Sequence, residues 1–360
     1  MKVISNIKGL VVPEGISGSE KMVKKKFLKK EVRHIDIKSF NAIPIIEQFS
    51  HMAFQAKNLA RAAAIYDRML QDSGCTIILC LAGSLFSAGL KNVVYDMIVH
   101  NMVDVIVSTG AIIVDQDFFE ALGAKHYQGS HLVNDDELMR NRIDRIYDTF
   151  IDEDELRVCD MKVKEIADSM DPGTYSSREF LIRMGEYLVE TNKGDNSVVG
   201  AAYTKGIPIF IPAFSDSSAG FGLVCHQIER EGKPAVAIDS VKDFRELTRI
   251  KITALDTGLF MIGGGVPKNF AQDVTVAADV MGEKVSMHKY AVQITVADER
   301  DGGLSGSTLK EAHSWGKVDE GNEQIVFSEA TIAFPLIVSY AYHRGSWKKR
   351  EEKRYNLLFS

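Results

Sequence analysis

Short apolar runs alternate with amphipathic stretches along the chain after Gly74. Most of these runs are continuously apolar, which is typical of strands that are covered on both faces in a parallel sheet. We expect strands at 76–81, 104–107, 207–211, 235–238, 259–262 and 291–296, and amphipathic helices between them at 88–100, 116–123, 178–191, 241–252 and 268–280. Strand and helix in repeated alternation predict an α/β, Rossmann-like, doubly wound sheet that is mostly parallel and carries helices on both faces.

The chain before this pattern differs in character. Residues 1–40 are polar and basic, so we expect an irregular arm whose lysine clusters, at 24–26 and 29–30, are solvated. Residues 41–72 place apolar side chains at helical spacing, which predicts two helices and makes the N-terminal arm of the fold helical. Because no internal repeat and no linker rich in Pro, Gly and Ser occurs, residues 41–345 are predicted to form a single domain.

Two further segments depart from the alternation. Residues 130–176 are acidic and helical with few strand signals, so they are interpreted as an insertion over one edge of the sheet. Residues 346–360 form a basic tail, in which Lys348, Lys349 and Arg350 are most simply the solvated end of a C-terminal helix. Docking of an acidic protein partner on this tail is the second interpretation.

Composition and charge restrict the function. The chain carries 49 acidic and 43 basic side chains, and its net charge of -6 argues against nucleic-acid binding, which needs a basic face. The same charge favours a small cationic substrate. The four cysteines show no metal-ligand spacing, nor do His126, His131 and His226, so we expect no metal. The N-terminus lacks a signal peptide and no apolar run reaches membrane-spanning length, so we expect a cytoplasmic protein without membrane contact.

Glycine-rich and hydroxylated loops follow most of the predicted strands, at 82–89, 108–111, 212–220, 263–268 and 301–306. In doubly wound sheets, ligands bind at the carboxyl ends of the strands, where these loops would lie together. Each loop alone is more often a tight turn than a phosphate cradle, and the G-x-G-x-x-G fingerprint is absent. Their recurrence at one sheet edge favours a nucleotide cofactor.

The stretch at 310–318, Lys-Glu-Ala-His-Ser-Trp-Gly-Lys-Val, concentrates reactive side chains in nine residues. A lysine beside Trp and Gly could sit in a partly desolvated pocket, which would lower its pKa and make the neutral amine available as a nucleophile. Imine formation is the chemistry that such a lysine does best. The alternative is that Lys317 is an ordinary surface lysine.

This stretch resembles the deoxyhypusine synthase family through Glu311-Ala-His-Ser-Trp-Gly-Lys317. The resemblance also rests on 73–77, 100–105, 263–266 and 334–336, and it runs in the family's order from about Ala53 to about Tyr340. It implies that 41–345 is an NAD-binding catalytic domain, which transfers a four-carbon amine unit from a polyamine to an acceptor amine. Lys317 occupies the position of the lysine that carries the imine. The resemblance further implies a homotetramer whose active sites are shared between subunits.

The family's functional residues carry over to positions in the loops already described. The resemblance implies substrate contacts at Glu311, Trp315, Asn269, Gly302, Gly303 and Asp115. In the family, the tryptophan ring flanks the carbon chain and the glutamate pairs with an ammonium. NAD contacts are implied at Ser84, Ser87, Thr109, Gly110, Ala111, Asp216, Ser218, Gly264, Asp301, Ser305, Glu329 and Ala330.

The chain departs from the eukaryotic members of the family at residues that bind the substrate. Phe221 and Leu304 stand where those members carry two aspartates, and Asn269 and Gln293 replace a histidine and a tyrosine. An extra residue also lies between Gly110 and Val114, which shifts the match of the following residues.

Losing a carboxylate that pairs with a buried ammonium should cost several kcal/mol unless another group replaces it. Asp115, Asp273 or Asp298 could compensate, and Asn269 with Gln293 could suit a guanidinium, which presents several donors in one plane.

We therefore expect a deoxyhypusine synthase-like transferase that acts on a small polyamine or a guanidino-amine such as agmatine. The alternative is true deoxyhypusine synthase activity, from spermidine to a lysine of the hypusine-containing translation factor. A third hypothesis, an NAD-binding scaffold without catalysis, is disfavoured because Lys317, Trp315 and Glu311 are all retained.

Overall fold

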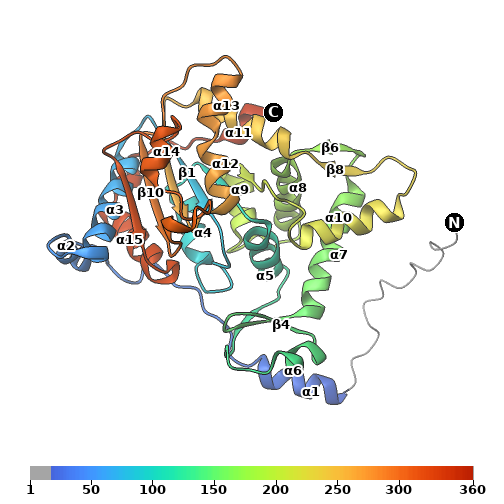
Figure 1. Cartoon of the computed structure of the whole chain (residues 1–360). Helices are drawn as coiled ribbons and strands as arrows, with labels where there is room; N and C mark the ends of the chain where they lie inside the picture. The colour runs from blue at the N-terminus through green and yellow to red at the C-terminus, as the bar shows by residue number, and fades with distance from the viewer. Residues whose placement is uncertain (1–17, 360) are drawn as a thin grey trace.

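The computed structural model describes residues 18–359, which fold around a six-stranded parallel sheet of order β11-β10-β9-β1-β2-β7 (Figure 1). The strands are β1 (Cys75–Leu81), β2 (Val105–Ser108), β7 (Ile209–Phe210), β9 (Asp256–Ile262), β10 (Tyr290–Thr295) and β11 (Glu323–Phe327). The chain starts at the centre with β1, builds one side through β2 and β7, and returns to build the other side from β9. This order is that of a dinucleotide-binding, doubly wound sheet, so the predicted fold class is confirmed.

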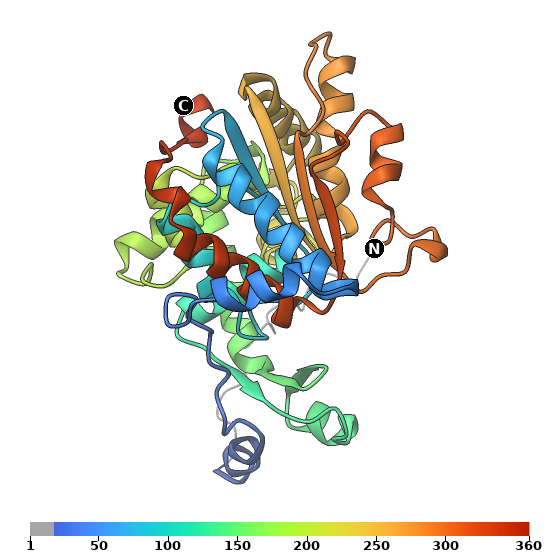
Figure 2. The same cartoon turned by 90° about the vertical axis from the view of Figure 1, so that its left-hand side faces the viewer.

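The central strand β1 separates two hydrophobic cores. Its seven residues are all buried, and successive side chains point to opposite faces because the side-chain period of a strand is two. Ile77 and Leu79 belong to the core under α3 (Phe54–Gln71) and α15 (Ala330–Arg344). Figure 2 shows these two helices lying across the face of the sheet that is turned toward the viewer.

The second core covers the opposite face, where Ile78 and Cys80 of β1 point. Its helices are α11 (Ser240–Thr253), α12 (Gly265–Gln272), α13 (Val274–Val280) and α14 (Leu309–Ser314). The expected helix at 268–280 is therefore two helices, which meet at Asp273. The remaining helices of the main body are α2 (Ile43–Ser50), α4 (Lys91–Val99), α8 (Ser177–Glu190), α9 (Val198–Lys205) and α10 (Ser218–Glu229). No helix between residues 18 and 359 combines the length and apolar character that crossing a membrane requires.

The segment 130–176 is partly helical, as interpreted, but it also contains strands that the sequence did not indicate. Two of its segments, β4 (Ile143–Ile146) and β5 (Thr149–Asp152), form a small antiparallel sheet of order β3-β5-β4 with the preceding β3 (His126–Gln128). A short helix, α6 (Asp135–Arg140), precedes β4, and a long one, α7 (Glu153–Ser169), follows β5. Each strand has only three or four residues and half of β4 is charged, so the strand signal in the sequence is weak.

The strand expected at 235–238 exists as β8 (Val236–Ile238), but it does not join the main sheet. It pairs in parallel with β6 (Gly173–Tyr175) as a separate two-stranded sheet. A three-residue apolar run predicts a strand, but it does not indicate which other strand pairs with it. The strand that pairs with β8 is β6, which follows α7, and this long helix leads the chain away from the main sheet (Figure 1).

The N-terminal arm contains a helix, α1 (Gly18–Phe27), which lies against the small antiparallel sheet (Figure 1). Lys24 is buried there, and its ammonium contacts Asp152 at 2.5 Å and Asp154 at 2.7 Å. The expectation that this lysine cluster is solvated is therefore wrong at Lys24, because the acidic start of α7 lies opposite it. The expected irregular arm before residue 18 lies outside the described residues.

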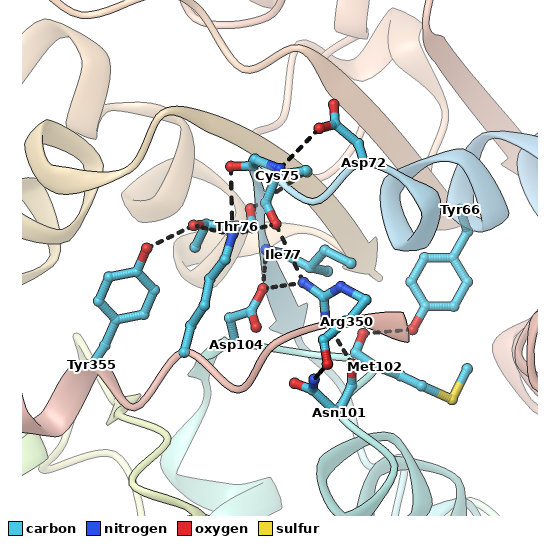
Figure 3. A network of polar contacts seen from close by, with 12 residues as sticks. Tyr66, Asp72, Cys75, Thr76, Ile77, Asn101, Met102, Asp104, Arg350 and Tyr355 are labelled. Carbon is cyan, nitrogen blue, oxygen red and sulfur yellow. Dashed lines mark hydrogen bonds and ion pairs between the residues drawn. The ribbon is translucent and has the colours of Figure 1, made fainter. Parts of the chain in front are cut away.

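The expectation of a solvated basic tail holds for Lys348 and Lys349, which are exposed, but it is wrong at Arg350. Arg350 donates to the Asp104 carboxylate at 2.6 Å, and the two side chains are 3% and 1% exposed. Asp104 also accepts from the Ile77 backbone N–H at 2.7 Å, and Arg350 donates to the Asn101 carbonyl at 2.6 Å (Figure 3). The tail thereby joins the amino ends of β1 and β2, at the sheet edge opposite the carboxyl ends of the strands.

Substituting Arg350→Met should lower the free energy of unfolding by about 3–5 kcal/mol, because Asp104 would stay buried without its cation. Urea denaturation measures the change. The control is Lys349→Met on the exposed side of the same tail, which should change stability by less than about 0.5 kcal/mol. An equally small effect for Arg350→Met would contradict the structural role of the pair.

Candidate functional site

A cavity of about 1030 Å³ opens at the carboxyl ends of β1, β9, β10 and β11. Gly83 and Ser84 after β1 face Gly263 and Gly264 after β9 across it. Between these two strands the chain order reverses, which is where open α/β sheets form their ligand crevices. The loops that follow the strands thus meet at one site, as their sequence pattern suggests.

The outer wall of the cavity comes from the N-terminal arm and the small antiparallel sheet. Val32 of the arm, Gln128 and Gly129 at the end of β3, and the β4–β5 turn at Tyr147 and Asp148 all line it. These segments carry no predicted site residue, and nothing in their local sequence marks them as cavity walls. Their role depends on contacts with strands far away in the chain.

Half of the residues expected to contact NAD line this cavity, namely Ser84, Ser87, Gly264, Ser305, Glu329 and Ala330. Ser87 is buried, and its hydroxyl donates to the Ser84 carbonyl at 2.8 Å. Glu329 caps α15 by accepting from the Thr331 backbone N–H at 2.9 Å. The cavity therefore presents hydroxyls, a carboxylate and open backbone, a combination that suits a nucleotide with ribose groups.

The other six residues expected to contact NAD lie outside the cavity lining. Thr109, Gly110 and Ala111 follow β2, and Asp216 and Ser218 follow β7. Asp301 lies at the end of an exposed turn, η2 (Glu299–Asp301), with Gly302 and Gly303, two of the expected substrate contacts. The structure thus divides the predicted set among the cavity, the neighbouring β2–β7 end of the sheet and an exposed loop.

A π-helix, η1 (Ala111–Phe118), connects the cavity to the β2–β7 end. The short helix α5 (Phe119–Ala121) continues it, so the helix expected at 116–123 begins earlier. The Gln116 side-chain oxygen accepts from the backbone N–H groups of Phe86 and Ser87, both at 2.9 Å, and so fixes the cavity loop after β1. The sequence gives no sign of this contact, because it joins residues 29 and 30 positions apart.

The neighbours of Gln116 on η1 reach two other segments. The Asp117 carboxylate accepts from the Val198 backbone N–H at 2.8 Å and so caps the start of α9. Asp115, an expected substrate contact, accepts from the Ser218 backbone N–H at 2.7 Å, at the start of α10. π-Helices are rare and occur frequently at functional sites.

Lys317 lies in a second cluster, between α12 and the end of α14. Its ammonium contacts the Asp273 carboxylate at 2.5 Å and the Asn269 side-chain oxygen at 3.5 Å, and Asn269 donates to Asp273 at 2.7 Å. α14 ends at Ser314, and Gly316, two residues later, has a φ of +69° that turns the chain so that the Lys317 side chain reaches α12. Lys317 is 13% exposed as a side chain, so it is not an ordinary surface lysine.

The other residues of the Lys317 motif differ in burial. The Trp315 ring lies 5.3 Å from the Lys317 ammonium and is 66% exposed, and Glu311 is exposed as well. The His313 ring contacts the Val318 carbonyl at 2.8 Å, which supports a packing role. None of these residues lines the cavity described above, nor do Lys317 and Asn269.

Gln293 does not join Asn269 as an amide pair for a guanidinium. Its side-chain nitrogen donates to the carbonyls of Gly263 and Ser305, at 2.9 and 3.1 Å, and the residue is fully buried. It therefore holds together two loops of the cavity wall. Asn269 in turn is engaged with Lys317 and Asp273.

Sequence reasoning missed the role of Lys268, which is fully buried beneath the Lys317 cluster. Its ammonium donates to the Ser307 carbonyl at 2.5 Å and hydroxyl at 3.0 Å. Burial lowers the pKa of Lys268 to about 8, against the opposing effect of the Glu311 carboxylate. Lys268 therefore fixes the loop that carries Ser305. Within residues 18–359, no group of three or more His, Cys, Asp and Glu side chains is placed to hold a metal ion.

Substituting Gln116→Leu should leave the Phe86 and Ser87 N–H groups buried without an acceptor, at about 1–3 kcal/mol of unfolding free energy. Amide hydrogen exchange at these two residues should become faster. Gln128→Leu, at an exposed position of the cavity wall, is the control and should leave exchange at residues 86 and 87 unchanged. Unchanged exchange in Gln116→Leu would mean that the loop is held by other contacts.

Comparison with known families and proteins supports the resemblance seen in the sequence. A family model described as deoxyhypusine synthase matches residues 44–341. A deoxyhypusine synthase-like protein of Chlorobaculum tepidum is 64% identical over 338 residues, which are 94% of this chain and 96% of that protein. A Methanosarcina mazei protein named "Probable deoxyhypusine synthase 2" is 40% identical over 327 residues, which are 91% of this chain and 92% of that protein.

A solved structure is also similar. The crystal structure of a protein from Entamoeba histolytica, assigned as a deoxyhypusine synthase, superposes with a TM-score of 0.60 at 21% sequence identity. The superposition covers 89% of this chain and 99% of that one. At this level of identity the structural similarity supports the fold alone. The chemistry has to be inferred from the residues of the site.

Proposed function

Because the chain belongs to the deoxyhypusine synthase family, whose members are aminobutyltransferases, we propose that it uses Lys317 to transfer a butylamine unit between amines. The unit is a 4-aminobutyl or guanidinobutyl group, the donor is a polyamine or an agmatine-like amine, and the acceptor is a second amine. The observation that carries this proposal is the cluster of Lys317, Asp273 and Asn269.

Lys317, Asp273 and Asn269 each have a separate role in the proposed reaction. Asp273, at 2.5 Å, accepts a proton from the Lys317 ammonium and leaves a neutral amine that can attack carbon. Asn269 donates to the second Asp273 oxygen and holds the carboxylate in this orientation. On a donor that has been oxidised to an imine, the Lys317 nitrogen would add to the imine carbon and expel the donor's amine, and the acceptor amine would then add to the Lys317 imine and expel Lys317. The Trp315 ring beside Lys317 offers a face for a cationic carbon chain.

The cavity suits NAD by size and by the groups it presents. Its volume of about 1030 Å³ lies at the upper end of the range of small-molecule sites, which is about 300–1,000 Å³. Ser84 and Ser305 would hold phosphates, with the Ser305 hydroxyl positioned by the Gly265 N–H at the start of α12, and Glu329 would accept from ribose hydroxyls. When bound, NAD would supply the hydride acceptor that oxidises the donor and later returns the hydride.

A homo-oligomer would complete the site. Lys317 and Trp315 do not line the cavity of their own chain, and Trp315 is largely exposed. Val266 on α12 and Val276 and Val280 on α13, near the Lys317 cluster, also expose apolar side chains. Apolar surface of this kind marks interaction sites, so we propose that a second copy covers it in a tetramer with shared active sites.

True deoxyhypusine synthase activity is the second candidate. The specific observation in its favour is the 40% identity with the Methanosarcina mazei protein, whose name states that activity. In this case the donor is spermidine and the acceptor is a lysine of the hypusine-containing translation factor. The exposed position of Trp315 leaves room for a protein acceptor as well as a small amine.

Substituting Lys317→Ala should retain NAD binding and lower transfer by at least about 100-fold, because no other amine occupies its position. Transfer is measured as labelled product from NAD and a donor amine. The control is Lys310→Ala, an exposed lysine on the same short helix, which should keep full transfer. Full transfer by Lys317→Ala would reject the proposed role.

Trapping with borohydride distinguishes the donors and acceptors. The protein is incubated with NAD and spermidine, putrescine or agmatine, reduced, and analysed by mass spectrometry for a four-carbon adduct on Lys317. The amine that gives the adduct is the donor. Labelling of the translation-factor lysine at a rate comparable to that of small amines would favour the second candidate. No adduct or product from any amine would favour a non-catalytic binding protein.

A further inference from the structure

A buried histidine, His288, lies between the two elements that meet at the Lys317 cluster. It precedes β10, and it does not line the cavity. Its backbone N–H donates to the Lys317 carbonyl at 2.9 Å, and its own carbonyl accepts from the Asp319 N–H at 2.9 Å. These two bonds form a parallel bridge in which His288 lies opposite Val318. The main chain on both sides of Val318, including Lys317, is therefore held by His288.

The His288 ring holds the facing helix. Its Nε2 atom lies 3.1 Å from the Ala271 carbonyl, and a carbonyl only accepts, so the ring nitrogen is the donor. Ala271 lies in the last turn of α12, between Asn269 and Asp273, which contact the Lys317 ammonium. His288 thus binds the Lys317 main chain through its backbone and binds the helix that receives the Lys317 side chain through its ring.

Two further buried side chains determine which ring nitrogen carries the proton. The Lys251 ammonium of α11 donates to the Thr257 hydroxyl of β9 at 2.7 Å, and this hydroxyl lies 2.8 Å from the His288 Nδ1 atom. An ammonium has only donors, so the Thr257 hydroxyl accepts from Lys251 and donates its own proton to Nδ1. The Nε2 atom then carries the ring proton, which is the tautomer that the contact with Ala271 requires.

The network of Lys251, Thr257 and His288 is closed off from solvent. The three residues are 1%, 0% and 0% exposed. Burial and the nearby Lys251 ammonium hold the pKa of His288 well below its usual range, and burial lowers the pKa of Lys251 to about 8. The ring is therefore neutral at pH 7, and its one donor and one acceptor are both used. A buried polar network that is fully satisfied fixes a single arrangement of the elements that carry it.

We propose that His288 is a positioning residue, which sets the distance and orientation between the Lys317 amine and the Asp273 carboxylate. Lys251 and Thr257 act through it by fixing the proton on Nε2. His288 is fully buried, so it acts through Lys317 and α12 and not by contact with the amine substrate. A displacement of about 1 Å at a reacting group can cost about 100-fold in rate. The inference rests on the proposed function, because it concerns the same reacting amine.

Substituting His288→Phe tests the proposal, because it keeps a ring and removes both side-chain hydrogen bonds. The value of kcat, measured as labelled product from NAD and spermidine, putrescine or agmatine, should fall at least about 10-fold. KM for the donor amine and for NAD should stay within about twofold, because the ring binds neither of them. His288→Gln keeps a donor and an acceptor and should restore kcat to within about threefold of the wild type.

The matched control is His226→Phe. His226 on α10 is 1% exposed, and its ring bonds with the Asp168 carboxylate at 2.7 Å and with the Val236 N–H at 3.0 Å. The same substitution there removes as many hydrogen bonds from an equally buried ring, so it should lower stability without changing kcat. Urea denaturation of both variants shows whether the losses of stability are comparable.

A second measurement does not depend on transfer. Acetic anhydride labels lysines according to their exposure and ionisation, and mass spectrometry gives the ratio of label at Lys317 to label at Lys310, an exposed reference on α14. In His288→Phe the Lys317 ammonium should separate from Asp273, and the ratio should rise at least about threefold. A role in stability alone would leave the ratio unchanged, because the protein is labelled well below its unfolding temperature.

Three results would overturn the inference. One is an unchanged kcat in both His288→Phe and Thr257→Val, of which the second removes only the hydroxyl and serves if the first does not fold. Another is an equal loss of kcat in His226→Phe, which would assign the effect to stability. The third is an unchanged label ratio in His288→Phe. If the wild-type protein transfers no group from any amine, the proposed function fails, and the label ratio still decides whether His288 positions Lys317.

Discussion

The parallel hydrogen-bonded ladder between β1 and β9 is the constraint on which the ligand-binding edge depends. The two strands pair in register over seven residues, from Cys75 opposite Asp256 to Leu81 opposite Ile262. They therefore end at the same level, and the loops after them begin opposite each other. A slip of one residue would exchange the side chains that β1 presents to the two hydrophobic cores, and neither core would then be packed as it is here. The position of the cavity follows from this register.

The amino ends and the carboxyl ends of the strands differ in the contacts they make. At the amino ends of β1 and β2, the C-terminal tail contributes a buried ion pair, Arg350 with Asp104, and further hydrogen bonds to the backbone. At the carboxyl ends, loops and not helices approach the strands, and they leave a cavity and buried acceptors. The buried ion pair and the cavity thus lie at opposite edges, so the loops can vary without loosening the strands.

Most of the sheet was predictable from the sequence, because continuous apolar runs identify buried parallel strands. The small antiparallel sheet was not, since Asp144 and Arg145 occupy half of a four-residue strand. Arg350 of the basic tail was misread because its partner lies 246 residues earlier in the chain. The loops at the strand ends could be identified as parts of the candidate site, because they are rich in glycine and hydroxylated residues. The contacts of Gln116 and Lys268 could not, because each depends on a partner that only the fold brings near.

The π-helix η1 joins three segments through three consecutive side chains, Asp115, Gln116 and Asp117. Deleting one residue from this stretch would restore α-helical geometry, but it would turn the following side chains by roughly 100° about the helix axis. The cavity loop, the start of α9 and the start of α10 would then lose their anchors together. The cavity and the β2–β7 end of the sheet are therefore not free to diversify separately, and a single insertion or deletion here would alter both in one step.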